Sequence, residues 1–155
     1  MVDLPVREDF AEFAARVEPR LRRALVAWCG LDVGTEATAD AMAYAWEHWA
    51  DLVAMDNPAG YLFRVGQSRS RRYRRRQVQL PAVPVTELPD VDPRLPAALA
   101  ALSPQQRTAV LLVHAHDLTY ADAAAVLDCS VSTLRNHLER ALTRLRDRLG
   151  VPDVD

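Results

Sequence analysis

The fold is decided by residues 118–146, LTYADAAAVLDCSVSTLRNHLERALTRLR. Apolar residues recur at helical spacing on both sides of the short break Asp128-Cys129-Ser130, and Thr119 precedes the first run as a capping residue. The small run Ala123-Ala124-Ala125 lets the two helices approach closely. Two helices joined by so short a turn are typical of a helix-turn-helix.

The second helix of this pair is predicted to run from about Val131 to Leu149, and Gly150 and Pro152 end it. Arginine can bond guanine, and asparagine can bond adenine, with two hydrogen bonds in the major groove. A DNA-reading face is therefore favoured over a helical hairpin with a solvated polar face. The candidate base-reading residues are Ser132, Thr133, Arg135, Asn136, Glu139 and Arg140.

A second helical unit is predicted for residues 97–150, opened by the capping box Ser103-Pro104-Gln105-Gln106. Residues 78–96 precede it, and five prolines between positions 81 and 96 predict a semi-extended acidic linker without helix. Sustained strand patterns are absent, so we expect an all-α chain of two small domains, 1–77 and 97–150.

The N-terminal domain is predicted to hold three helices, over residues 8–29, 36–52 and 59–76. Gly30 and Gly34 are expected to bracket the break between the first two, and Asp56-Asn57-Pro58 to form the turn before the third. The apolar side chains expected to face inward from the second helix are Ala39, Met42, Ala43, Trp46, Trp49 and Val53.

Charge is unevenly distributed along the chain. Residues 1–60 hold 5 arginines and 11 acidic residues, whereas residues 61–76 hold 7 arginines and no acid. The net charge of −2 hides this contrast, and local charge is what a polyanion meets. Because like charges destabilise an isolated helix, we expect a polyanion or the acidic N-terminal surface to offset the block. Its face alternates arginines with Gln67, Ser68 and Tyr73, which suit phosphate contacts and base stacking.

Other chemistries are disfavoured. Cys29 and Cys129 lie a hundred positions apart and are predicted to be buried thiols. His114 and His116 are two residues apart, whereas zinc-binding helices place histidines four apart, so we expect no metal site. The sequence contains no nucleophile-base arrangement and no phosphate-binding glycine loop. We therefore expect no enzyme activity, no cofactor and no small-molecule substrate. The sequence lacks a long apolar run and a signal-peptide pattern, so we expect a cytoplasmic protein without direct membrane insertion.

Residues 97–149 resemble region four of the extracytoplasmic-function sigma factors, the smallest type of bacterial sigma factor. LSPQQR opens this region, LTYADAAAVL is similar to its first helix-turn-helix element, and VSTLRNHLERAL is similar to its recognition helix. NPAGYLFRVGQSRSRRYRRR, residues 57–76, looks like the end of region two, and ADAMAYAWEHW looks like the helix before it.

The resemblance implies two partners, core RNA polymerase and promoter DNA, and raises an anti-sigma factor as a third. Region four would read the minus-thirty-five element, and region two would bind the polymerase clamp and open the minus-ten element. The polymerase-binding residues it implies are Asp40, Ala43, Tyr44 and Glu47. The minus-ten residues it implies are Arg64, Gln67, Ser68, Arg71, Arg72, Arg74 and Arg75.

The chain departs from the family pattern at several of these positions. Ala43-Tyr44 stands where the family usually has Gln-Glu, and only Asp40 remains of the acidic signature. Gln67-Ser68 and Arg72 stand where Arg-Asn and then Asp are common.

Two alternatives remain at this point. TLRNHLERALTRL also resembles the recognition helix of LuxR-type regulators, which bind operators as dimers without polymerase. A protein-binding adaptor with a vestigial helix-turn-helix is the other reading. It would lack the salt-dependent DNA affinity that phosphate contacts produce.

Overall fold

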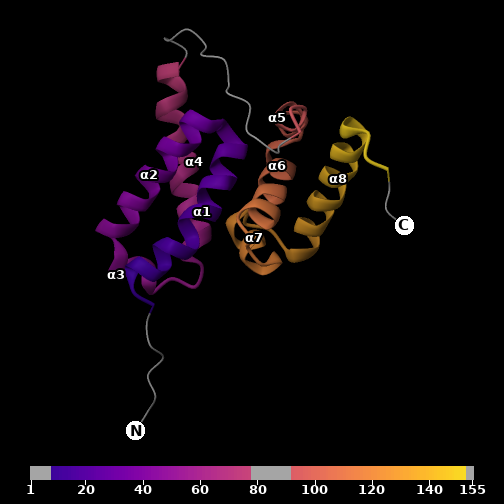
Figure 1. Cartoon of the computed structure of the whole chain (residues 1–155). Coiled ribbons are helices and arrows are strands. Elements are labelled where there is room, and N and C mark those ends of the chain that lie inside the picture. The colour runs from indigo at the N-terminus through magenta and orange to yellow at the C-terminus, as the bar shows by residue number, and fades with distance from the viewer. Residues whose placement is uncertain (1–7, 78–91, 153–155) are drawn as a thin grey trace.

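The computed structural model describes residues 8–77 and 92–152, and every regular element in these ranges is helical. Figure 1 shows two groups of helices, which we call the N-terminal bundle and the C-terminal bundle. The N-terminal bundle consists of α1 (Phe10–Cys29), α2 (Leu31–Glu47), α3 (Trp49–Val53) and α4 (Pro58–Gln77). The C-terminal bundle consists of α5 (Leu95–Ala100), α6 (Pro104–Val110), the π-helical turn η1 (Leu111–Ala115), α7 (Tyr120–Val126) and α8 (Val131–Leu149).

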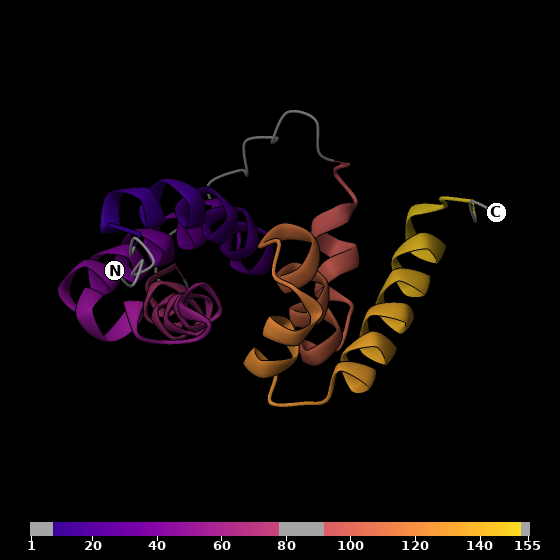
Figure 2. The same ribbon diagram turned by 90° about the horizontal axis from the view of Figure 1, so that it is seen from below.

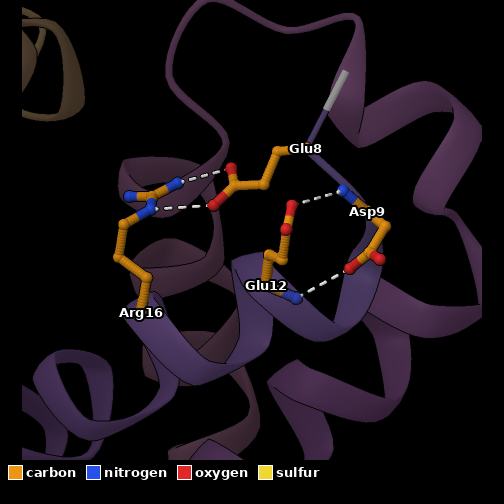
Figure 3. A network of polar contacts seen from close by, with 4 residues as sticks. All are labelled: Glu8, Asp9, Glu12 and Arg16. Atoms are coloured by element: carbon orange, nitrogen blue, oxygen red, sulfur yellow. Dashed lines mark hydrogen bonds and ion pairs between the residues drawn. The ribbon is translucent and has the colours of Figure 1, made fainter. Parts of the chain in front are cut away.

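Helix α1 begins with a capping box that the sequence analysis did not identify. The Asp9 carboxylate accepts a hydrogen bond from the Glu12 amide at 2.8 Å, and the Glu12 carboxylate accepts one from the Asp9 amide at 3.3 Å (Figure 3). Arg16 forms an ion pair with Glu8 at 2.8 Å beside it. These contacts satisfy backbone donors that a helix leaves free in its first turn, and they fix the start of the bundle.

Helix α2 begins earlier than predicted and buries a different face. Gly34 was expected to mark a break, but it lies inside α2, where a Cβ would stand 2.5 Å from the Val26 Cα of α1. The buried apolar side chains of α2 are Val33, Ala37, Ala41 and Ala45, whereas the predicted inward residues Ala39, Ala43 and Trp46 are exposed. Small residues at every fourth position let α1 and α2 pack at close range, and this packing overrides the preference of large apolar side chains for the core.

Helix α4 starts at Pro58, as the turn before it predicted. The Asn57 side-chain oxygen accepts a hydrogen bond from the Gly60 amide at 3.1 Å, which satisfies a free donor of the first turn. Leu62 and Phe63 are fully buried against the rest of the bundle. The first half of α4 is therefore anchored in the core, and the arginine-rich second half extends beyond it (Figure 1).

The capping predictions for the C-terminal bundle are confirmed. Ser103 and Gln106 form the predicted capping box, and Thr119 accepts a hydrogen bond from the Asp122 amide. Ser130, which was predicted only as part of the break, also caps α8 by accepting a hydrogen bond from the Thr133 amide. Gly150 ends α8 in the left-handed conformation, with φ of 65°. The sequence analysis expected no helix within residues 78–96. This prediction is wrong, because α5 begins at Leu95 and a proline is tolerated in the first turn of a helix. Residues 78–91 of the predicted linker lie outside the described residues.

The two bundles pack against each other, with α1 and α4 facing η1 and α7 (Figures 1 and 2). Four side chains cross the interface to main-chain carbonyls. Arg23 Nε donates to Ala115 O at 2.7 Å, and Asn57 Nδ2 donates to Asp122 O at 3.1 Å. Arg107 donates to Trp28 O, and His116 Nε2 lies 2.9 Å from Ala59 O. Buried apolar side chains from both bundles form one continuous cluster, so the tethered bodies expected from the sequence are in contact here.

Candidate nucleic-acid and protein interfaces

Helix α8 presents the polar face that the sequence predicted. Leu134, Leu138, Ala141 and Leu145 are buried along one side, and α7, whose Ala123 and Ala124 are buried, packs against α8. The reversal between the two helices is made at Asp128, whose φ is 52°. All six candidate base-reading residues are exposed: Ser132, Thr133, Arg135, Asn136, Glu139 and Arg140.

Sequence reasoning missed two neighbours of this face. The Arg135 guanidinium lies 5.7 Å from the ring centroid of Tyr120, which is 42% exposed at the start of α7. Arg144 donates to the Gln106 side-chain oxygen at 3.2 Å. A shallow cleft of 440 Å³ runs between Asn136, Arg140 and Arg144, with Glu139 and Thr143 also lining it. The face is thus partly oriented by contacts with α6 and α7.

The arginine-rich half of α4 is largely solvent-facing. Arg64, Ser68, Arg71, Arg72, Arg74 and Arg75 are exposed, and Gln67 is half-buried. Tyr73, which the sequence analysis predicted to stack on bases, is half-buried, and its hydroxyl donates to the Asp40 carboxylate at 2.8 Å, so it faces α2 in this structure. This hydrogen bond raises the pKa of Tyr73. The exposed arginines give α4 a surface of positive charge only, and the acidic helix α2 packs against the other side of α4.

The exposed surface of α2 combines acids with aromatic rings. Ala43 and Glu47 are exposed, and Asp40 is half-buried beside Tyr73. Tyr44 stacks on His48 with centroids 4.1 Å apart, and its hydroxyl lies 3.2 Å from that of Tyr61.

Trp46, which the sequence analysis placed inside, is 67% exposed and packs edge-on against Phe10 at 5.0 Å. An aromatic side chain exposed in this way is typical of protein interfaces. The hydrophobic periodicity had instead assigned Trp46 to the core.

The histidine and cysteine side chains differ in how far they are buried. His116 is 1% exposed in the interface between the bundles, and burial lowers its pKa, while His114 is exposed. Cys29 and Cys129 are free and half-buried, and burial raises the pKa of Cys29. Within residues 8–77 and 92–152 no group of three metal-ligating side chains occurs, and none of the helices there could span a bilayer.

Comparison with known proteins agrees with this arrangement. Residues 93–145 match the family Sigma-70, region 4. The chain is 34% identical over 131 residues to an RNA polymerase sigma-E factor of Streptomyces antibioticus, covering 76% of this chain and 70% of that protein. It is 32% identical over 127 residues to the sigma-E factor of Streptomyces coelicolor, covering 74% and 71%.

A solved structure of the sigma factor RpoE in complex with the anti-sigma factor NepR, from Bartonella quintana, has a TM-score of 0.75 and 26% identity, covering 94% of this chain and 99% of that one. CnrH, solved in complex with the cytosolic domain of CnrY, shares the fold, with a TM-score of 0.67.

A helix-turn-helix beside an arginine-rich helix, in a chain whose described elements are all helical, is typical of a DNA-binding protein. The chain belongs to the extracytoplasmic-function sigma factors, which direct RNA polymerase to promoters. The comparisons give no support to the LuxR-type alternative.

Proposed function

We propose that the exposed faces of α8, α4 and α2 divide the work of a sigma factor among three surfaces. The observation that carries this proposal is the exposure of all six polar residues on one side of α8, with the apolar stripe of that helix buried. A helix with such a face enters the major groove, and its varied side chains discriminate between bases. In this proposal α8 reads the minus-thirty-five element.

The second surface is the arginine-rich half of α4. Its exposed cations suit the closely spaced phosphates of DNA at the minus-ten element, and guanidinium groups bond phosphate bidentately. Gln67 and Ser68 lie on the same helix and supply polar groups for unstacked bases. This division assigns residues 1–77 to polymerase binding and promoter opening, residues 97–150 to upstream recognition, and residues 78–96 to the connection between them.

The third surface is the exposed side of α2, where Asp40, Ala43, Tyr44 and Glu47 would contact core polymerase. Trp46 extends this surface with a large apolar side chain, which compensates for the small Ala43. Aromatic side chains of this kind contribute strongly to protein association. The chain itself would carry no catalytic activity and would act in the cytoplasm, where its polymerase partner works.

A transcription reaction reconstituted with core polymerase tests the proposal. A library of promoters with two varied elements should yield a preferred pair of sequences, and the chain should be retained by core polymerase in a pull-down. Failure to select any promoter, together with failure in the pull-down, would contradict the assignment. A dimer on operator DNA without polymerase would instead favour a stand-alone regulator.

An anti-sigma factor is a further partner that we propose, because RpoE of Bartonella quintana was solved with one and resembles this chain over nearly its whole length. The exposed α2 surface is a reasonable site for such an inhibitor, since occupying it would exclude polymerase. Competition between polymerase and a candidate anti-sigma protein for the chain would test this assignment.

A further inference from the structure

A cleft lies where the two bundles meet, between the second half of α4 and the start of α6. Its volume is 390 Å³, within the range of small-molecule sites. Nine side chains line it, and none is acidic. The polar and aromatic ones used below are Trp28 of α1, Gln67, Arg71 and Arg74 of α4, and Gln105 and Thr108 of α6.

Two arginines converge on one backbone carbonyl at this cleft. Arg74 Nη2 donates to Trp28 O at 3.3 Å, and Arg107 of α6 donates to the same oxygen. The Arg107 guanidinium also lies 3.8 Å from the centroid of the Trp28 ring. Arg71 lines the same cleft one helical turn before Arg74. Two cations of α4 and one of α6 therefore lie near Trp28; Arg71 and Arg74 line the cleft, and Arg107 lies beside it against the Trp28 ring.

The positive charge of this cluster is not balanced in the part of the chain that the structure describes. No carboxylate there forms an ion pair with Arg71, Arg74 or Arg107. Burial, and then the charge of Arg74, lower the pKa of Arg107. The Arg107 Nε is buried without a hydrogen-bond partner. Of the three cations only Arg107 is partly buried, and a partly buried cation without a counter-charge is costly, so a nearby anion would relieve that cost.

We propose that this cleft is a binding site for a small polyphosphate anion. Guanidinium groups recognise phosphate oxygens bidentately, and several of them together match an anion with more than one phosphate group. The side chains of Gln67, Gln105 and Thr108 add donors for the remaining oxygens. Because the site combines side chains of both bundles, a bound anion holds them together.

The site has a consequence for DNA binding that rests on the proposed function. Arg71 and Arg74 belong to the residues proposed to contact the minus-ten element, and they cannot serve a small anion and DNA at once. An anion in the cleft therefore reduces the affinity of the chain for DNA, as linkage between competing ligands requires.

Inorganic pyrophosphate is the probe, titrated into the full chain at constant ionic strength and measured by calorimetry and by the shift of the unfolding temperature. We expect saturable binding. Arg71→Gln and Arg74→Gln, which remove cations that line the cleft, should each raise the Kd about tenfold or more, and Arg107→Gln, beside the cleft, should raise it by less. Arg69→Gln is the matched control, because Arg69 carries the same charge on α4 but does not line the cleft, and its Kd should stay within about twofold.

Circular dichroism separates loss of the site from loss of the fold, and Arg107→Lys, which keeps the charge without the planar fork, should give an intermediate Kd. No saturable binding to the wild-type chain, or equal weakening by Arg69→Gln, overturns the proposal. An equal shift of the unfolding temperature by sulfate at the same ionic strength would show adventitious anion binding and would also overturn the proposal. If the cluster takes DNA phosphates only, Arg107→Gln lowers DNA affinity while pyrophosphate gives no signal, and the proposal also fails.

These measurements need neither promoter nor polymerase. A chain that binds pyrophosphate but directs no transcription would contradict the proposed function alone, and a chain that directs transcription without binding pyrophosphate would contradict this inference alone.

Discussion

The polar faces of α8 and α4 are both exposed, but they are built differently. The α8 face carries five kinds of side chain, Ser, Thr, Arg, Asn and Glu, on a helix whose opposite side is buried from Leu134 to Leu145. The second half of α4 repeats arginine and contains no acid. A varied face can distinguish base edges, whereas a uniform cationic face responds to the phosphate backbone, which is the same in every sequence. The difference suggests that selectivity and affinity are located in different bundles.

The largest expected effect comes from disrupting the packing of the N-terminal bundle, which carries α4. In Gly34→Val the new side chain would meet the α1 backbone, which cannot move aside as a side chain could. We expect a loss of about 3 kcal/mol or more in the free energy of unfolding of the N-terminal bundle. Thermal unfolding would measure it. Ala39→Val on the exposed side of α2 is the control, and an equal loss there would show that the close approach of α1 and α2 is not the cause.

The next effect is on base choice. Arg135→Ala removes a side chain suited to a bidentate bond with guanine, so discrimination at one upstream position should fall by about 1–3 kcal/mol. Ranking of a promoter library before and after the change would measure it. Arg148→Ala, exposed in the last turn of α8, should leave the ranking unchanged. An unaltered ranking for Arg135→Ala would mean that the DNA-reading face has been placed wrongly.

Replacing Arg74 and Arg75 together with Ala should act on all sequences alike. Each neutralised phosphate contributes about 0.9 to the slope of log affinity against log salt, so the slope should become shallower by about 1.8. Titrations with promoter and random DNA at several salt concentrations would measure the change. A loss confined to one sequence would contradict the assignment of α4 to the backbone.

The interface between the bundles should respond to pH. Burial holds the pKa of His116 below the ordinary value of about 6.5, although its hydrogen bond to Ala59 and the charge of Asp117 act in the opposite direction. Arg20 and Arg23 also disfavour its protonation. The stability that neutral His116 contributes is therefore complete above about pH 6.5 and is lost as the pH falls below it. The free energy of unfolding of His116→Gln should decline less between about pH 7.5 and about pH 5.5. Equal declines would exclude His116 as the source.

The smallest effect concerns the orientation of Arg135. Tyr120→Leu removes the ring beneath its guanidinium, an interaction worth about 0.5–1 kcal/mol at an exposed site. Base preference should weaken at the same position as in Arg135→Ala, but by less. Tyr120→Phe keeps the ring and should keep most of the preference, and a Phe variant as weak as the Leu variant would point to the hydroxyl instead.

Much of the C-terminal bundle could be predicted from the sequence because its signals are local. Ser103, Thr119 and Ser130 each cap a helix within three residues, and the leucine stripe of α8 is regular. The exposed set on α8 followed from that stripe. Tyr120 was missed because its contact with Arg135 depends on the angle between two helices, which no local pattern encodes.

The N-terminal bundle was harder to predict because its packing is set by small side chains. Ala37, Ala41 and Ala45 carry little hydrophobic signal, yet they are fully buried in the N-terminal bundle. Trp46 contributes strongly to any periodicity sum and drew the predicted inner face toward the exposed side of α2, whereas Met42 does pack, half-buried, against the core. The cleft at Trp28 could not be foreseen, since it needs residues from α1, α4 and α6 that are far apart in the sequence.

Four of the hydrogen bonds between the bundles end on peptide carbonyls, at Trp28, Ala59, Ala115 and Asp122, whereas the ion pairs of Arg20 and Arg23 with Asp117 join two side chains. A carbonyl is present whatever side chain its residue carries. Each of these bonds therefore depends on the identity of one amino acid instead of two, so the accepting residue is free to change during evolution without loss of the bond. Chimeras that exchange one half of the chain with that of a relative should retain those bonds for which the donor is kept.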